Sequence, residues 1–222
     1  MAIEFSITIV IIAITVIASF FAFNNREKLG QWMMNPYAVV HYKDYKRLLT
    51  HGLIHGDMMH LFFNVFVLHQ FGSSVEMVFT NESAFNVVFG MQNWWGSGMG
   101  ISMFLMLYIG AIFAATIPSI IKHKDNPGYN SLGASGAVSA VLIVYILIQP
   151  TASLTLLIFP FFPIPAWVMG ILFFVFEAYM NKRGGTGIAH DAHIYGAIYG
   201  LLFMTVVQPS VWTWFFGTLF GG

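Results

Sequence analysis

Six apolar stretches, separated by polar or glycine- and proline-rich segments, constrain most strongly what this chain can fold into. They cover residues 3–23, 57–79, 98–121, 133–148, 166–180 and 188–207. A helix needs roughly 20 mostly apolar residues to cross the hydrocarbon core of a bilayer. Only 8% of the residues are charged, against about 25% in an average soluble domain. We therefore expect an all-α membrane protein, a bundle of six transmembrane helices forming a single domain over residues 1–222.

The charge composition excludes some classes of function. The 9 Lys and Arg residues balance 9 Asp and Glu residues, so the chain lacks the basic excess on which nucleic-acid binding depends. It has no cysteine, and therefore no disulfide framework and no thiolate nucleophile or metal ligand. We expect a lipid bilayer around the protein, no nucleic-acid partner and no cofactor.

The segments outside the apolar stretches carry their own signals. Residues 24–56 mix Arg and Lys with Trp and Tyr, which is typical of a structured loop at the membrane interface. The first stretch lacks the basic start and the cleavage pattern of a signal peptide, so we expect a retained anchor. Prolines between 150 and 165 should delay the fifth helix until Ala166. Residues 212–220 look like an interfacial tail.

Polar side chains inside apolar stretches are costly at membrane depth and therefore mark candidate functional sites. His60 and Asn64 lie four residues apart in the second stretch, so a helix projects them from one face. Two neutral donors side by side could stabilise a developing oxyanion. The alternative is that they tie helices together by hydrogen bonds.

A serine flanked by glycines opens the fourth stretch. Ser135 lies between Gly133 and Gly136, so it has little steric cover, and a helix N-terminus at this point favours negative charge. The alternative is close helix packing through Gly136 and Ala140.

A histidine precedes a pair of glycines in the sixth stretch. Gly196 and Gly200 form a GxxxG face that lets another helix approach closely. His193 lies one turn earlier and could be held against a serine, and such a pair suffices as nucleophile and base. Asp191 falls on another part of the helix surface, so we expect a dyad without a carboxylate.

The other histidines raise the alternative of a metal site. His51 and His55 precede His60, and His190 precedes His193. No HExxH motif occurs, and no carboxylate or cysteine completes a ligand set in the sequence. We expect no metal, and we expect His51 and His55 to belong to the structure of the loop.

Together these motifs resemble those of the rhomboid family of intramembrane serine proteases, in its prokaryotic six-helix form. They occur in the family's order as His60-xxx-Asn64, Gly133-x-Ser135-Gly136 and Ala192-His193-xx-Gly196-xxx-Gly200. Arg47 and Glu76 match the family's loop arginine and second-helix glutamate. The resemblance covers nearly the whole chain.

The resemblance implies an intramembrane serine endopeptidase. Ser135 would be the nucleophile and His193 the general base and later the acid. His60, Asn64 and the backbone N–H of Ser135 would form the oxyanion hole, with Gly133, Gly136, Gly196 and Gly200 packing the helices around the site. The implied substrates are membrane-anchored proteins, cut in or near a transmembrane segment.

Two positions depart from the family pattern. Lys46 stands beside Arg47 where the family commonly has tryptophan. Ser139 stands where the family often has an aromatic residue that stacks on the catalytic histidine. Neither departure removes a reacting group.

The basic residues bear on orientation in the membrane. All Lys and Arg follow the first, third and fifth stretches, at the end where the site is expected to open, and the positive-inside rule would place this end in the cytoplasm. The resemblance implies an extracytoplasmic opening in a prokaryotic inner or plasma membrane, and we expect that orientation.

Two other functions stay open as alternatives. A catalytically inactive rhomboid-like protein that binds transmembrane helices would typically lack the serine or the histidine. A small transporter would carry inverted repeats and paired broken helices, which this sequence does not show. The substrate, the cleavage site and the oligomeric state cannot be read from the sequence.

Overall fold

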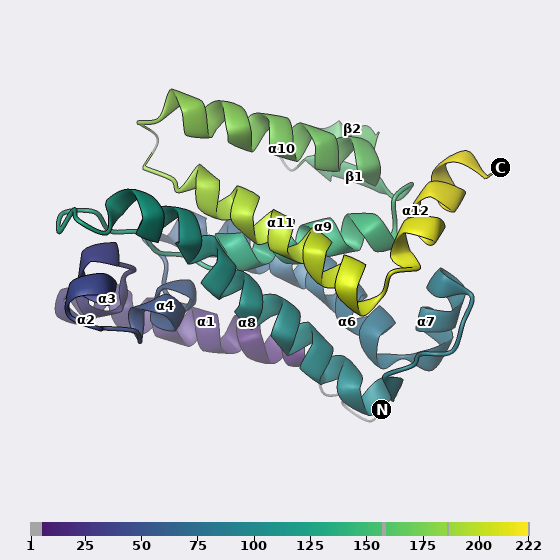
Figure 1. Ribbon diagram of the computed structural model, residues 1–222, viewed down its shortest axis with the longest axis horizontal. Helices are drawn as coiled ribbons and strands as arrows, with labels where there is room; N and C mark the ends of the chain where they lie inside the picture. The colour runs from purple at the N-terminus through teal and green to yellow at the C-terminus, as the bar shows by residue number, and fades with distance from the viewer. Residues whose placement is uncertain (1–5, 157–158, 186, 222) are drawn as a thin grey trace.

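The computed structural model describes residues 6–156, 159–185 and 187–221 as a bundle of helices with one small β-hairpin (Figure 1). The elements run in the order α1 Ile7–Phe23, α2 Arg26–Trp32, α3 Pro36–His41, α4 Arg47–Thr50, η1 His51–Leu53, α5 Met58–Val67, η2 Leu68–Gly72, α6 Ser73–Thr80, α7 Glu82–Phe89, α8 Gly96–His123, α9 Ser135–Ile148, β1 Ser153–Leu156, β2 Phe159–Pro165, α10 Ala166–Arg183, α11 His190–Val207 and α12 Val211–Phe220. Residues 3–5 of the first expected helix lie outside the described part of the chain.

Few of these helices are long and apolar enough to cross a membrane unaided. Met58–Thr80, which joins α5, η2 and α6, and Gly98–His123 within α8 meet both criteria. The helices α11 and α12, bent by 105° at their junction, make a third candidate if they are counted as one span. The apolar helices α1 and α9 have only 17 and 14 residues. The described residues thus provide two or three candidate spans, and the arrangement of six transmembrane helices stays a prediction.

The short helix α9 lies in the middle of the bundle, and most of its side chains are buried. Helices α8 and α11 pack against it and against each other. A β-carbon at Gly200 would lie 2.7 Å from the carbonyl oxygen of Ala140, and one at Gly196 would collide with the backbone of Gly136. Glycine is therefore required where α11 crosses α9, as the GxxxG pattern predicts.

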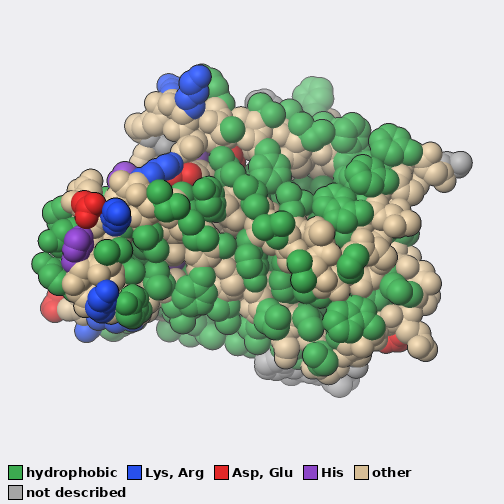
Figure 2. Space-filling view, in the orientation of Figure 1, with side chains coloured by type: hydrophobic (Ala, Val, Ile, Leu, Met, Phe, Trp, Pro, Cys, Tyr) green, Lys and Arg blue, Asp and Glu red, His purple; other side chains and the backbone are tan. Residues whose placement is uncertain are grey.

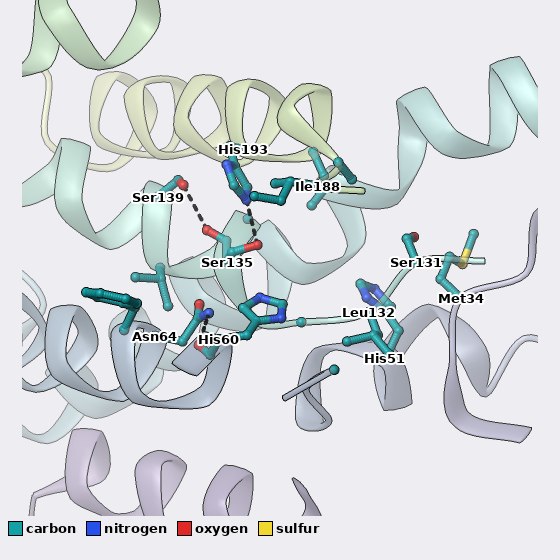
Figure 3. Close-up of a pocket in the computed structure, with 18 of the residues that line it drawn as sticks. Met34, His51, His60, Asn64, Ser131, Leu132, Ser135, Ser139, Ile188 and His193 are labelled. Atoms are coloured by element: carbon teal, nitrogen blue, oxygen red, sulfur yellow. Dashed lines mark hydrogen bonds between the residues drawn. The ribbon is translucent and has the colours of Figure 1, made fainter. Parts of the chain in front are cut away.

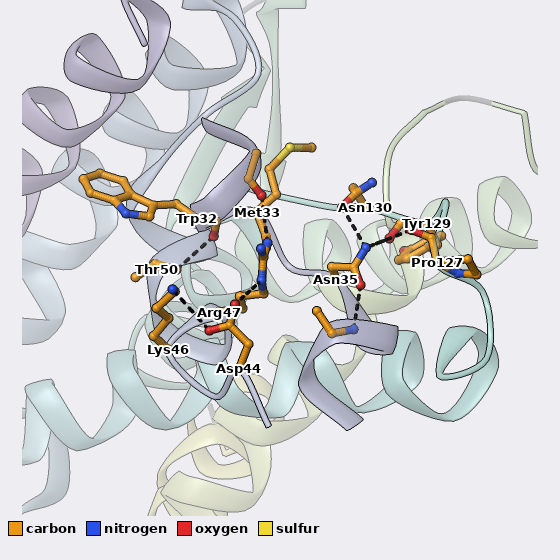
Figure 4. Close-up of polar contacts among 12 residues, drawn as sticks. Trp32, Met33, Asn35, Asp44, Lys46, Arg47, Thr50, Pro127, Tyr129 and Asn130 are labelled. Carbon is orange, nitrogen blue, oxygen red and sulfur yellow. Dashed lines mark hydrogen bonds and ion pairs between the residues drawn. The ribbon is translucent and has the colours of Figure 1, made fainter. Parts of the chain in front are cut away.

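The segment between α1 and α5 is folded into short helices rather than extended. Arg47 ties it together, because its guanidinium donates to the carbonyl oxygens of Gly30 and Met33 and to the carboxylate of Asp44, each at 2.8 Å (Figure 4). Lys46 is exposed and lies 3.4 Å from the same carboxylate. Arg47 is thus a structural residue of this loop.

A β-hairpin precedes α10, where an all-α fold was expected, and that expectation is wrong here. The strands β1 and β2 are antiparallel, with Ser153 opposite Pro165 and Leu154 opposite Ile164. Proline is disfavoured in helix interiors but tolerated in edge strands, and both strands of a two-stranded hairpin are edges. The prolines therefore direct this segment into a hairpin, and α10 begins directly after it at Ala166.

Positive charge is concentrated at one end of the molecule. Lys and Arg side chains gather around α2–α4 and the C-terminal end of α10, while hydrophobic side chains cover most of the remaining face (Figure 2). A surface this apolar suits a lipid environment.

Candidate active site

A cavity of about 850 Å³ opens between α5, α9, α10, α11 and the loop that leads into α9. Its walls combine polar side chains with apolar ones such as Phe63, Leu142 and Phe173. The expected site residues that line it are His60, Asn64, Gly133, Ser135, Gly136 and His193. The structure therefore brings together three motifs that lie far apart in the sequence.

Ser135 is the first residue of α9, and the turn before it fixes its position. Gly133 has a φ of 118°, which side-chain-bearing residues rarely adopt, and a β-carbon there would lie 2.6 Å from Cε1 of His60. The N–H of Gly133 donates to the carbonyl oxygen of His51 at 2.9 Å. The segment between α1 and α5 thus holds the turn that presents the serine.

His193 lies in the first turn of α11 and points at the serine. Its Nε2 is 2.7 Å from Oγ of Ser135 (Figure 3). The approach depends on Gly196, one turn later, which lets α11 contact the backbone of α9. A serine within hydrogen-bond reach of an imidazole is the minimal arrangement of an activated nucleophile.

A carboxylate that the sequence did not reveal lies behind this histidine. Oε2 of Glu177, in α10, is 3.1 Å from Nδ1 of His193 and 2.7 Å from Nδ1 of His190. The structure thus places a carboxylate beside the pair, where the sequence indicated none. The acid nearer in sequence, Asp191, instead lies 2.5 Å from Nζ of Lys122.

His60 and Asn64 lie on the α5 side of the cavity, across from Ser135 (Figure 3). The ring of His60 packs edge-on against His55, with centroids 4.8 Å apart. The carboxamide nitrogen of Asn64 donates to the carbonyl oxygen of His60 at 2.9 Å. Both side chains share the cavity with the serine, and their role as oxyanion donors stays a prediction.

Ser139 follows Ser135 by one turn on α9. Its hydroxyl donates to the carbonyl oxygen of Ser135 at 2.8 Å (Figure 3). This bond stays within the helix, as is common for serine at such a position. Ser139 therefore does not replace the stacking aromatic residue as a support for His193.

The loop histidines are buried and uncharged at neutral pH. Burial lowers the pKa of His51 to about 4 and that of His55 to about 3. Nδ1 of His55 lies 3.0 Å from the hydroxyl of Ser19 in α1, so this histidine joins the loop to the first helix. The structural role expected of His51 and His55 stays a prediction.

One group of side chains could hold a metal ion. Glu177, His190 and His193 each offer a ligand atom, and these atoms lie within 4.8 Å of one another. The expected absence of a metal weighed His190 and His193 together with the earlier histidines but found no carboxylate to complete a ligand set, and Glu177 is such a carboxylate. Both histidines are 13 residues or more from Glu177 along the chain, so only the tertiary structure reveals this group of three.

The fold and the site define a helical membrane protein with a serine–histidine–carboxylate arrangement in a cavity between its helices. A sequence model of the Rhomboid domain matches residues 42–210, and the chain belongs to the rhomboid family. The resemblance to the rhomboid family drawn from the motifs is therefore confirmed.

Two curated relatives add context. The chain is 29% identical over 177 residues to RHOMBOID-like protein 12, mitochondrial, of Arabidopsis thaliana, with 75% of this chain and 49% of the relative covered. It is 24% identical over 166 residues to the presenilin-associated rhomboid-like protein, mitochondrial, of Bos taurus, with 74% of this chain and 39% of the relative covered. The alignments thus span half or less of these relatives. Both names place the relatives in mitochondria and give no support to the expected prokaryotic plasma membrane.

Proposed function

We propose that this protein is an intramembrane serine endopeptidase that hydrolyses peptide bonds in or near the transmembrane segments of membrane-anchored proteins. The observation that carries the proposal is the 2.7 Å contact between Nε2 of His193 and Oγ of Ser135. Membership of the rhomboid family, which includes such proteases, supports it.

The reaction would follow the general course of serine hydrolysis. Ser135 Oγ attacks the carbonyl carbon of the peptide bond while His193 Nε2 takes the hydroxyl proton. The same imidazolium then gives this proton to the departing amine, which leaves an acyl-enzyme. Water deprotonated by His193 attacks the ester, and the proton returns to Ser135 as the new carboxyl product leaves.

The oxyanion formed in each half-reaction needs donors at a fixed position. The first backbone N–H groups of a helix have no carbonyl partner within it, and Ser135 is the first residue of α9. We assign the backbone N–H of Ser135, together with His60 and Asn64 on the facing wall, to this role. Their preorganisation would lower the barrier without any movement of the protein.

The walls of the cavity suit both reactants. Asp57, Asn130 and Ser131 provide polar groups for water, and Phe63 and Phe173 provide apolar surface for a transmembrane segment. Backbone that is not helical is tolerated at membrane depth only where it lines such a cavity, and the turn at Gly133 does so. We further propose that the site opens on the extracytoplasmic side of its membrane.

The test is labelling by a fluorescent fluorophosphonate in detergent, together with cleavage of a transmembrane substrate. We expect the wild-type protein to be labelled and to cleave, and Ser135→Ala and His193→Ala to do neither. A folded wild-type protein that is neither labelled nor active would overturn the proposal. It would favour the alternative of an inactive rhomboid-like protein that binds transmembrane helices.

A further inference from the structure

The Glu177 side chain occupies an unusual place for a carboxylate. It projects from α10, an apolar helix, and only 8% of the side chain is exposed. A buried carboxylate is costly unless it is paired and hydrogen-bonded. Both partners here are histidines of α11, and one of them also contacts Ser135.

The hydrogen-bonding capacity of each group decides which ring nitrogens of His190 and His193 carry protons. An ionised carboxylate only accepts hydrogen bonds, so Nδ1 of His193 and Nδ1 of His190 must each carry a proton toward Oε2 of Glu177. In neutral His193 the other nitrogen, Nε2, is then unprotonated. That is the nitrogen 2.7 Å from Ser135 Oγ, and it can accept the hydroxyl proton.

We propose that Glu177 is a positioning residue that acts through His193 and extends the Ser135–His193 pair to a relay of three groups. It selects the reactive tautomer of His193, fixes the orientation of the ring, and stabilises the imidazolium that forms when Ser135 attacks. His190 donates to the same oxygen and fixes Glu177 in turn. This inference rests on the proposed function.

Other groups near the site do not supply this support. Asp191 is paired with Lys122, and its second oxygen accepts the N–H of Ala192 at 2.9 Å. The Ser139 hydroxyl is bonded to a carbonyl oxygen of its own helix. Among the described residues, Glu177 is the carboxylate that lies within 4 Å of a His193 ring nitrogen.

The first experiment compares Glu177→Gln and Glu177→Ala with the wild-type full-length protein in detergent. Glutamine keeps an oxygen that can accept an N–H but carries no charge, and alanine keeps neither. We expect kcat to fall by about 10-fold or more in both variants, and by up to about 10⁴-fold, which is the loss that the carboxylate-to-amide change produces in a serine–histidine–aspartate protease. KM for a transmembrane substrate should change less than about twofold, because only 8% of the Glu177 side chain is exposed and it is proposed to act through His193.

Asp191→Asn is the matched control. This substitution removes a carboxylate close to His193 in the sequence, but one that is paired with Lys122. The kcat of Asp191→Asn should equal that of the wild type. Glu177→Gln with wild-type kcat and wild-type rates of fluorophosphonate labelling would overturn the inference. Serine-dependent cleavage by the wild type would still support the proposed function in that case, whereas failure of the wild type itself would overturn both.

A second measurement needs no variant at Glu177, in case both variants fail to fold. Nitrogen-15 spectra of histidine-labelled protein, with His193 assigned by comparison with His193→Ala, report which ring nitrogen carries the proton. We expect a protonated Nδ1 and an unprotonated Nε2, and the opposite tautomer would contradict the proposed relay. If a chelator abolishes cleavage and Zn²⁺ restores it, the three side chains hold a metal and the positioning role is overturned.

Discussion

Gly196 of α11 lies so close to Gly136 of α9 that a β-carbon cannot fit between the two helices. The obstacle is the backbone of Gly136, which cannot rotate away as a flexible side chain could. The same crossing sets the position of His193, one turn before Gly196. The approach of the two helices and the contact between His193 and Ser135 therefore depend on each other.

Replacing Gly196 by alanine should separate α11 from α9. We expect a loss of about 1–3 kcal/mol in stability, which is typical of overpacking, and loss of most fluorophosphonate labelling because His193 moves away from Ser135. Thermal unfolding and labelling kinetics measure the two effects. Gly217→Ala is the control, since a β-carbon there meets nothing within 4 Å, and an equal effect of both substitutions would contradict the argument.

The carboxylate of Glu76 binds the start of α1. It accepts the backbone N–H groups of Ile7 and Thr8 at 2.7 and 3.0 Å and the hydroxyl of Ser6 at 2.8 Å. Glu76→Ala leaves these donors without the acceptor, so we expect a stability loss of about 1–3 kcal/mol with kcat retained in the folded fraction. Unfolding in denaturing detergent measures this loss of stability. Exposed Glu27→Gln should have no effect, and a large loss of kcat at unchanged stability would refute a purely structural role for Glu76.

Arg47 holds the loop between α1 and α5 through three hydrogen bonds. Lysine cannot reproduce the planar fork of the guanidinium, so Arg47→Lys should loosen the loop. We expect faster cleavage by added trypsin between residues 26 and 47 and a lower unfolding temperature. Lys46→Ala changes the neighbouring exposed residue and should leave the unfolding temperature unchanged. Equal protease sensitivity of wild type and Arg47→Lys would count against this role.

The buried loop histidines make stability depend on pH. The folded protein holds the pKa of His51 at about 4 and that of His55 at about 3, below the ordinary value of 6.5. As the pH falls, the unfolded chain therefore takes up protons on these histidines before the folded protein does. The free energy of unfolding should be highest above pH 6.5 and should decrease toward pH 4. Each histidine should contribute at most about 1.4 kcal/mol per pH unit.

Unfolding free energies at pH 7 and pH 5 test this dependence. His51→Asn and His55→Asn should each reduce the difference between the two pH values, even where they lower stability overall. Variants that keep the full wild-type difference would show that other groups are responsible.

The orientation in the membrane is open to a direct test because the chain has no cysteine. Tyr45 lies in the loop and is 57% exposed, so Tyr45→Cys provides a single reporter thiol. We expect a membrane-impermeant maleimide to label it from the extracytoplasmic side of intact cells. Labelling only after the membrane is opened would reverse the proposed orientation and agree with the distribution of Lys and Arg.

The local signals of the sequence located most of the candidate site. Ser135, His193 and their glycines are recognisable because nucleophile turns and GxxxG faces depend on residues only a few positions apart. The start of α10 at Ala166 was predicted for the same reason, since proline blocks helices locally. The β-hairpin before it was missed, because a proline-rich segment does not indicate whether a second strand is available for pairing.

The sequence by itself determined an apolar, helical chain of the rhomboid family with its serine, its histidine and the small residues between them. Only the tertiary structure decided which carboxylate lies beside that histidine. Asp191 is near His193 in the chain but pairs with Lys122, whereas Glu177 belongs to another helix and reaches His193 because α10 packs against α11. Helical periodicity fixes which residues share a face, but the partner that each face meets depends on how the helices pack.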